Sequence, residues 1–287
     1  VGLDAVEVDF LCIAQLEQLA LEPRQAFGID LAGAMAAGLE GQADGADGAG
    51  RTDGFIPAQA VQGGFDNRIS SFNRATQAQR QPGSTIKPLP VLAALENGTA
   101  TMDTVISTGY GPVRIGGRLV RDINGYGDLD LTGIMRKSSN IGVTRLALGL
   151  PTDKFLDMYY KMGVGSETGL GLTGETPGVL REQRRWGEHA LATISFGYSF
   201  TVNAVQLARI YATIANGGVS YPLSIFKSDK KPLGERVVSE QHADNMVAML
   251  EAVVGPGGSA KKAAVPATKK APAKKVVAKK AAPAKKA

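Results

Sequence analysis

A serine and a lysine three positions apart, Ser84 and Lys87, are the residues of this sequence best suited to covalent chemistry. A Pro-Gly turn precedes the serine, and the apolar run 89–95 predicts a helix behind it. On a helix, positions i and i+3 lie on one face, so the amine could reach the hydroxyl. A serine needs a nearby base to become a nucleophile, and a lysine is that base only when neutral. Burial and the positive end of a helix dipole both lower a lysine pKa. The alternative is a serine that caps the helix, with a solvated lysine behind it.

A second pair of polar residues, Ser138 and Asn140, stands between two predicted helices, 131–135 and 141–148. A loop between helices can project a hydroxyl and an amide into a cleft. The hydroxyl could relay a proton between a lysine and a leaving amine, and the amide could bind the backbone of a substrate. The alternative is that this pair caps the helix that follows.

The surrounding elements follow from periodicity and turn residues. Short strands and turns are predicted for 105–120. Further helices are predicted for 153–162 and for the stretch 206–218 with a glycine cap. Residues 192–198 are predicted to form a loop, and residues 222–225 to start a strand.

Both motifs resemble those of the transpeptidase domains of penicillin-binding proteins. The stretch 81–88 is similar to the first motif of that family, Ser-x-x-Lys with its neighbours, and Ser138-Ser139-Asn140 with its flanks is similar to the second. The resemblance covers about residues 63–254 and implies a loop for the glycine-rich stretch 163–175 and a helix for 243–253. Residues 62–76 resemble the bifunctional, class A enzymes, whereas the chain after Lys87 resembles the monofunctional, class B enzymes of cell division more closely.

This resemblance implies an α+β fold of the penicillin-binding and β-lactamase-like type, with an antiparallel sheet flanked by helices and a helical lobe that holds both motifs. It also implies a peptidoglycan D,D-transpeptidase that crosslinks stem peptides in cell-wall and septum synthesis. In that role Ser84 attacks the carbonyl of the penultimate D-alanine and Lys87 is the base. Ser138 relays the proton, and Asn140 binds the substrate. β-Lactams would acylate the same serine, and no metal or organic cofactor is implied.

The resemblance places the protein at the extracytoplasmic, periplasmic face of the inner membrane, with cell-division and cell-wall synthesis proteins as further partners. The sequence shows no signal peptide and no apolar stretch approaching the roughly 18 residues of a membrane helix. The single cysteine, Cys12, excludes an internal disulfide and a multi-cysteine metal site. The two histidines, His189 and His242, lack metal-ligand spacing.

The C-terminal end departs from the family pattern. In the family, a strand with Lys-Thr-Gly or Lys-Ser-Gly follows the helix that residues 243–253 resemble, and the backbone of that strand completes the oxyanion hole. Here residues 257–259 lead into repeats of alanine, proline and lysine. We therefore expect the last strands of the domain to be missing. Removing one oxyanion donor typically costs about a hundred- to a thousand-fold in rate, and losing the strand should cost more.

Composition divides the chain into three predicted segments. Residues 1–54 are a poorly defined N-terminal segment with a Gly/Ala/Asp-rich linker, 55–255 an incomplete transpeptidase-like domain, and 256–287 a disordered tail rich in Lys, Ala and Pro. The net charge of +5 comes from the tail, whose ten lysines leave 22 basic against 27 acidic residues elsewhere.

Two alternatives to the active enzyme stay open at this point. The first is a noncatalytic transpeptidase-like protein whose lysine-rich tail binds nucleic acid or another anionic polymer through counterion release. For the tail itself, the plain alternative is a solvated run of charge. The second alternative is a serine β-lactamase of the same superfamily.

Overall fold

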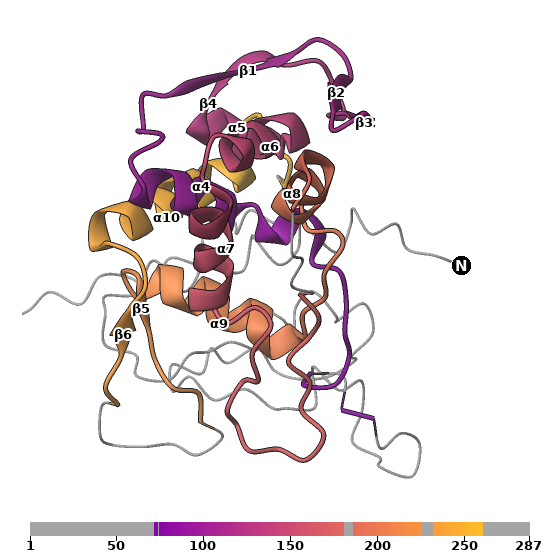
Figure 1. Cartoon of the computed structure of the whole chain (residues 1–287). Coiled ribbons are helices and arrows are strands. Elements are labelled where there is room, and N and C mark those ends of the chain that lie inside the picture. The colour runs from indigo at the N-terminus through magenta and orange to yellow at the C-terminus, as the bar shows by residue number, and fades with distance from the viewer. Residues whose placement is uncertain (1–71, 74, 181–185, 225–231, 261–287) are drawn as a thin grey trace, which may run out of the picture.

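The computed structural model describes residues 72–73, 75–180, 186–224 and 232–260, in which a group of helices carries short strand pairs at its margin (Figure 1). The helices are η1 (Gly83–Ile86), α4 (Pro88–Glu96), α5 (Leu131–Lys137), α6 (Asn140–Leu148), α7 (Thr152–Lys161), α8 (Glu188–Ser195), α9 (Ala204–Ala215) and α10 (Glu240–Val254). The strands are β1 (Val105–Gly109), β2 (Val113–Ile115), β3 (Arg118–Val120), β4 (Gly127–Asp130), β5 (Val219–Ser220) and β6 (Glu235–Arg236). None of the described helices combines the length and the apolarity needed to cross a membrane. The predicted boundary at residue 54 and nearly all of the predicted tail lie outside the described residues.

Helix α4 is the centre of the hydrophobic core. Every residue from Pro88 to Leu95 is buried, and a helix that is apolar all round has to be surrounded by other elements. Helices α6, α7 and α10 pack against it and contribute wholly buried side chains such as Val143, Phe155 and Met246. Each such side chain stabilises the fold by about 1.5–3 kcal/mol. Because Lys87 directly precedes α4, the first motif is anchored to the core helix.

The strands form three separate antiparallel pairs, and the part of the chain that is described holds no larger sheet. β1 pairs with β4, with Val105 opposite Asp130. β2 and β3 form a hairpin whose turn residues, Gly116 and Gly117, have φ of 53° and 81°. Two consecutive positive φ angles are what a two-residue turn of this kind requires. The short strands predicted for 105–120 are therefore confirmed, and helices with antiparallel strands fit the predicted α+β class.

Two local predictions are wrong. Residues 192–195 belong to helix α8 and not to a loop, because Leu191 and Ile194 are buried in the core while α8 packs against α6. In a helix this short, tertiary packing outweighs local preference. Residues 222–224 do not start a strand, since β5 ends at Ser220. Pro222 follows closely and has no N–H to offer to a ladder.

The glycine-rich segment after α7 forms a loop, as predicted, and Gln206 of α9 holds it. Asn203 and Gln206 form a capping box at the start of α9. The side-chain amide of Gln206 donates in addition to three carbonyl oxygens of the loop, those of Gly163, Ser166 and Pro177. Gln206 is buried, so these bonds replace the water that the loop carbonyls would otherwise need.

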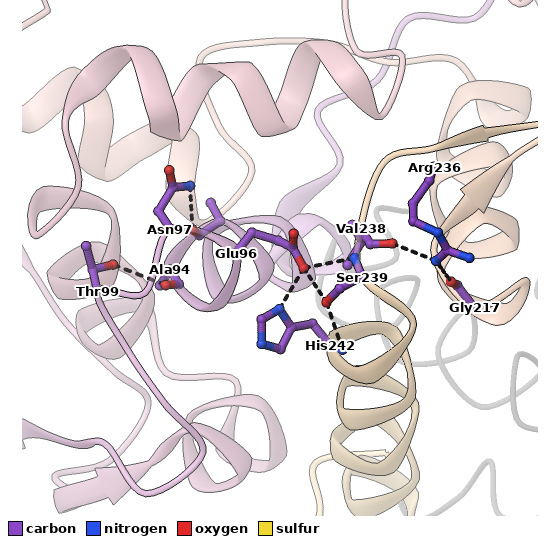
Figure 2. Close-up of polar contacts among 10 residues, drawn as sticks. Ala94, Glu96, Asn97, Thr99, Gly217, Arg236, Val238, Ser239 and His242 are labelled. Atoms are coloured by element: carbon purple, nitrogen blue, oxygen red, sulfur yellow. Dashed lines mark hydrogen bonds and ion pairs between the residues drawn. The ribbon is translucent and has the colours of Figure 1, made fainter.

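A carboxylate ties the end of α4 to the start of α10 (Figure 2). Oε1 of Glu96 accepts hydrogen bonds from the N–H (2.9 Å) and the Oγ (2.7 Å) of Ser239 and lies 2.6 Å from Nδ1 of His242. Ser239 is the N-cap of α10, and its Oγ accepts from the N–H of His242. In a capping box, the third residue of the same helix normally supplies a carboxylate to the N-cap. Here Glu96, the last residue of α4, supplies that carboxylate to the N-cap of α10.

We expect Glu96→Gln to weaken the fold at neutral pH and to reduce its acid sensitivity. Partial burial acts to raise the pKa of Glu96, but hydrogen bonds from Ser239 and His242 outweigh it and lower the pKa. A lowered folded-state pKa gives stabilisation that is complete above the unfolded glutamate pKa, about 4.3, and is lost as the pH falls through the folded value. Because the carboxylate is partly exposed, we expect an effect of about 1 kcal/mol.

Urea titrations of the wild type and Glu96→Gln at pH 7 and at acid pH measure this difference. Glu251→Gln, on an exposed position of α10, is the matched control and should keep the wild-type pH dependence. Identical pH profiles for the two variants would contradict the assignment.

Candidate active site

Ser84 lies on the 3₁₀ turn η1, directly before α4, and is partly exposed. The N–H of Lys87 donates to the carbonyl of Ser84 (3.2 Å). This bond between residues i and i+3 sets the two residues one above the other on the same side of the turn. The predicted helix thus begins as a tighter turn and becomes α-helical at Pro88, where the missing N–H of a proline is tolerated.

The serine turn is fixed by two segments from the second half of the chain. The N–H of Gly83 donates to the carbonyl of Gly197 (3.0 Å), in the loop after α8. The hydroxyl of Tyr211, on α9, donates to the carbonyl of Thr85 (2.7 Å). Both bonds are made to the backbone on either side of Ser84, so they set the position of its hydroxyl without engaging it.

The amine of Lys87 joins the two motifs. Only 2% of the surface of Lys87 is exposed, which excludes the alternative of a solvated lysine. Its Nζ donates to the carbonyl oxygen (2.5 Å) and to the Oγ (2.8 Å) of Ser138. The first and second motifs, far apart in the sequence, therefore meet at this buried amine.

The backbone of Ser138 has an uncommon conformation that makes both bonds possible. Ser138 ends helix α5 in the left-handed region, with φ 54°, a conformation that costs a non-glycine residue about 1–3 kcal/mol. The N–H of Ser138 donates to the carbonyl of Met135, and the N–H of Ser139 donates to the carbonyl of Ile134. These two bonds close the end of α5. The left-handed turn directs the carbonyl and the hydroxyl of one residue to the same amine.

The helix that follows is capped neither by Ser138 nor by Asn140, as the alternative had it, but by the residue between them. Ser139 is the N-cap of α6, and its Oγ accepts from the N–H of Gly142 (2.9 Å). Asn140 is the first residue of α6, and its Nδ2 donates to the carbonyl of Arg121 (3.1 Å). The bonds described at this site thus join Ser138 to Lys87, whereas Asn140 is held by the segment between β3 and β4.

Three residues that position the site are absent from the sequence predictions. Asp122 accepts three hydrogen bonds from the second motif, and Tyr211 and Gly197 hold the serine turn. An acid after a short strand and a tyrosine inside a helix carry no signal of such roles. Gly197 could have been found, because a glycine directly after a helix often adopts the left-handed conformation that it has here, with φ 87°.

The segment that follows α10 contacts the end of α5, next to Ser138. The N–H of Ser259 donates to the carbonyl of Arg136 (3.1 Å), and Nζ of Lys137 donates to the carbonyl of Gly257 (2.9 Å). Residues 255–260, where the stretch expected to lack the third-motif strand begins, form no strand, and the rest of that stretch lies outside the described residues. Within 72–73, 75–180, 186–224 and 232–260, no group of three His, Cys, Asp or Glu side chains could hold a metal ion.

Comparison with known proteins identifies the family. The model of the penicillin binding protein transpeptidase domain matches residues 49–279. Over 193 residues the chain is 44% identical to the peptidoglycan D,D-transpeptidase FtsI of Escherichia coli K12, covering 67% of this chain and 32% of that protein. It is 38% identical over 193 residues to the probable peptidoglycan D,D-transpeptidase PenA of Neisseria gonorrhoeae, covering 67% and 33%.

Two solved structures have the same fold. The transpeptidase domain of Burkholderia pseudomallei penicillin-binding protein 3 matches with a TM-score of 0.66 and 37% identity, over 68% of this chain and 60% of that one. A structure described as a peptidoglycan glycosyltransferase from Burkholderia ambifaria matches with a TM-score of 0.67 and 36% identity, over 69% and 64%. The chain spans about a third of the length of the curated relatives named above. With the family model covering most of its length, the chain belongs to the penicillin-binding protein transpeptidase domain family.

Proposed function

We propose that this chain carries the acylation site of a peptidoglycan D,D-transpeptidase, with Ser84 as nucleophile and Lys87 as its base. The observation that carries the proposal is the pair of hydrogen bonds from the buried Lys87 amine to Ser138. An amine oriented by two bonds, one turn from a partly exposed serine, is the arrangement that activates a hydroxyl. The names of the relatives, FtsI and PenA, support the same reaction.

In the first half of the proposed reaction, Oγ of Ser84 bonds to the carbonyl carbon of the penultimate D-alanine while Lys87 takes the hydroxyl proton. The bond to the nitrogen of the terminal D-alanine breaks, and that nitrogen receives the proton through the hydroxyl of Ser138. In the second half, the amino group of another stem peptide attacks the ester, a new amide forms, and Ser84 recovers a proton. Asn140 binds the backbone of the acyl donor in both halves.

The substrates proposed here are peptidoglycan stem peptides, and β-lactams would acylate Ser84 as substrate analogues. This chemistry belongs outside the cytoplasmic membrane, at the periplasmic face, because stem peptides are crosslinked there. Further partners would be proteins of cell division and cell-wall synthesis, as the division-type resemblance implies.

Labelling with a fluorescent penicillin tests the proposal. We expect one covalent adduct per chain by intact mass, and fragmentation of the labelled peptide should place it on Ser84 and not on the neighbouring Thr85. A folded protein that takes up no label would overturn the enzymatic proposal. Rapid release of hydrolysed antibiotic, in place of a stable adduct, would indicate a serine β-lactamase.

A further inference from the structure

The carboxylate of Asp122 is bonded to three consecutive residues of the second motif. Asp122 lies just after β3 and is partly buried. Its Oδ2 accepts from the Oγ of Ser139 (2.6 Å), and its Oδ1 accepts from the N–H groups of Asn140 (2.6 Å) and Ile141 (3.0 Å). None of these bonds engages the hydroxyl of Ser138, which accepts from Lys87. Asp122 therefore holds the backbone that follows Ser138 and leaves its side chain to the lysine.

The start of α6 needs this carboxylate because its own residues cannot supply one. The first N–H groups of a helix have no acceptor within the helix. Ser139, the N-cap, satisfies only the N–H of Gly142. Gly142 stands at the third helical position, where a glutamate would return a bond to the cap, and glycine has no side chain to do so. Asp122 accepts from the two N–H groups in between and places a negative charge at the positive end of the helix dipole.

Ser138 is consequently held from both sides in its left-handed conformation. On one side, its N–H and that of Ser139 are bonded to the end of α5. On the other side, Asp122 fixes the residues that follow. We infer that Asp122 is the positioning residue of the second motif, which sets the direction in which Ser138 presents its carbonyl and hydroxyl to Lys87. As far as it concerns acylation of Ser84, this inference rests on the proposed function.

A role in stability alone would have different consequences. An acid that only caps α6 would change the unfolding temperature and leave the folded protein fully reactive. A positioning residue changes the reactivity of the folded protein, because a displacement of about 1 Å at a catalytic group can cost on the order of a hundred-fold in rate. The two roles are therefore separated by measuring the acylation rate and the stability of the same variants.

The first experiment compares acylation rates by fluorescent penicillin at a temperature where every variant is fully folded. Asp122→Asn keeps the size of the side chain, removes its charge and turns one acceptor into a donor. We expect it to be acylated about 10- to 100-fold more slowly than the wild type. Asp128→Asn repeats the charge change at an exposed residue of β4. Ser239→Ala removes a helix cap at the start of α10. Both controls should react at the wild-type rate.

Wild-type reactivity of Asp122→Asn, or an equal loss in Ser239→Ala, would overturn the inference. The second experiment tests whether Asp122 holds the backbone of this motif even if the wild type takes up no penicillin, in which case the proposed function fails by itself. Hydrogen exchange is followed by mass spectrometry on peptides that contain residues 138–142. Asp122→Asn should exchange at least tenfold faster there than the wild type, with α10 unchanged, because the N–H groups of Asn140 and Ile141 exchange a charged acceptor for the weaker, neutral amide oxygen. Unchanged exchange in these peptides would refute the positioning role.

Discussion

Replacing Lys87 by methionine is expected to slow acylation of Ser84 by about a hundred- to ten-thousand-fold, the range that general acid–base groups typically contribute. Methionine is similar in length and fills the same buried space, but it has no group that can take the proton of the serine. It also removes both hydrogen bonds to Ser138, so the two motifs would no longer be joined. The second-order rate constant for fluorescent penicillin measures the effect.

Two further variants make this result interpretable. Lys161→Met removes an exposed lysine of α7 that forms an ion pair with Asp157 one turn away and should leave the rate unchanged. Ser84→Ala defines the background of nonspecific labelling. Near-ultraviolet circular dichroism checks that Lys87→Met is folded. If the folded variant reacts within tenfold of the wild type, a group other than Lys87 takes the proton of Ser84.

The parts of the site that are best predicted from the sequence are those whose pattern lies within a short stretch of the chain. The turn before Ser84, the burial of an apolar run after it and the helix–loop–helix around Ser138 can each be recognised within about ten residues. The meeting of Lys87 with Ser138 was expected from the chemistry that the two motifs share in the family. The geometry of that meeting depends on the left-handed backbone of Ser138, and a serine gives no warning of such a conformation.

The parts that sequence missed are contacts between distant segments through ordinary residues. Asp122, in the segment between β3 and β4, binds the second motif, from which β4 and α5 separate it in the sequence. Glu96 binds Ser239, which lies 143 positions further along the chain. Any exposed acid could have either role, because a helix start accepts a carboxylate from wherever the fold brings one. Helix α8 was missed for a related reason, since its packing on α6 and not its own sequence selects the helix.

The loop after α8 contacts the turn that carries Ser84. The carbonyl of Gly197 accepts the N–H of Gly83, and Gly197 has φ 87°. A Cβ at this position would collide with the backbone of Gly83. We expect Gly197→Ala to lose about 1–2 kcal/mol from the left-handed backbone and about 1–3 kcal/mol more from the collision. The turn of Ser84 must then move, and a shift of about 1 Å would slow acylation on the order of a hundred-fold.

Gly169→Ala isolates the two contributions. Gly169 has a similar positive φ of 78°, but a Cβ there would meet nothing within 4 Å. The control should lose only the backbone contribution in a urea titration and should react with penicillin at the wild-type rate. The difference between the two variants measures what the Gly83–Gly197 contact does for Ser84. If both variants lose equal stability and react equally fast, the serine turn does not depend on the loop after α8, and its position must be set by Tyr211 and the core helix alone.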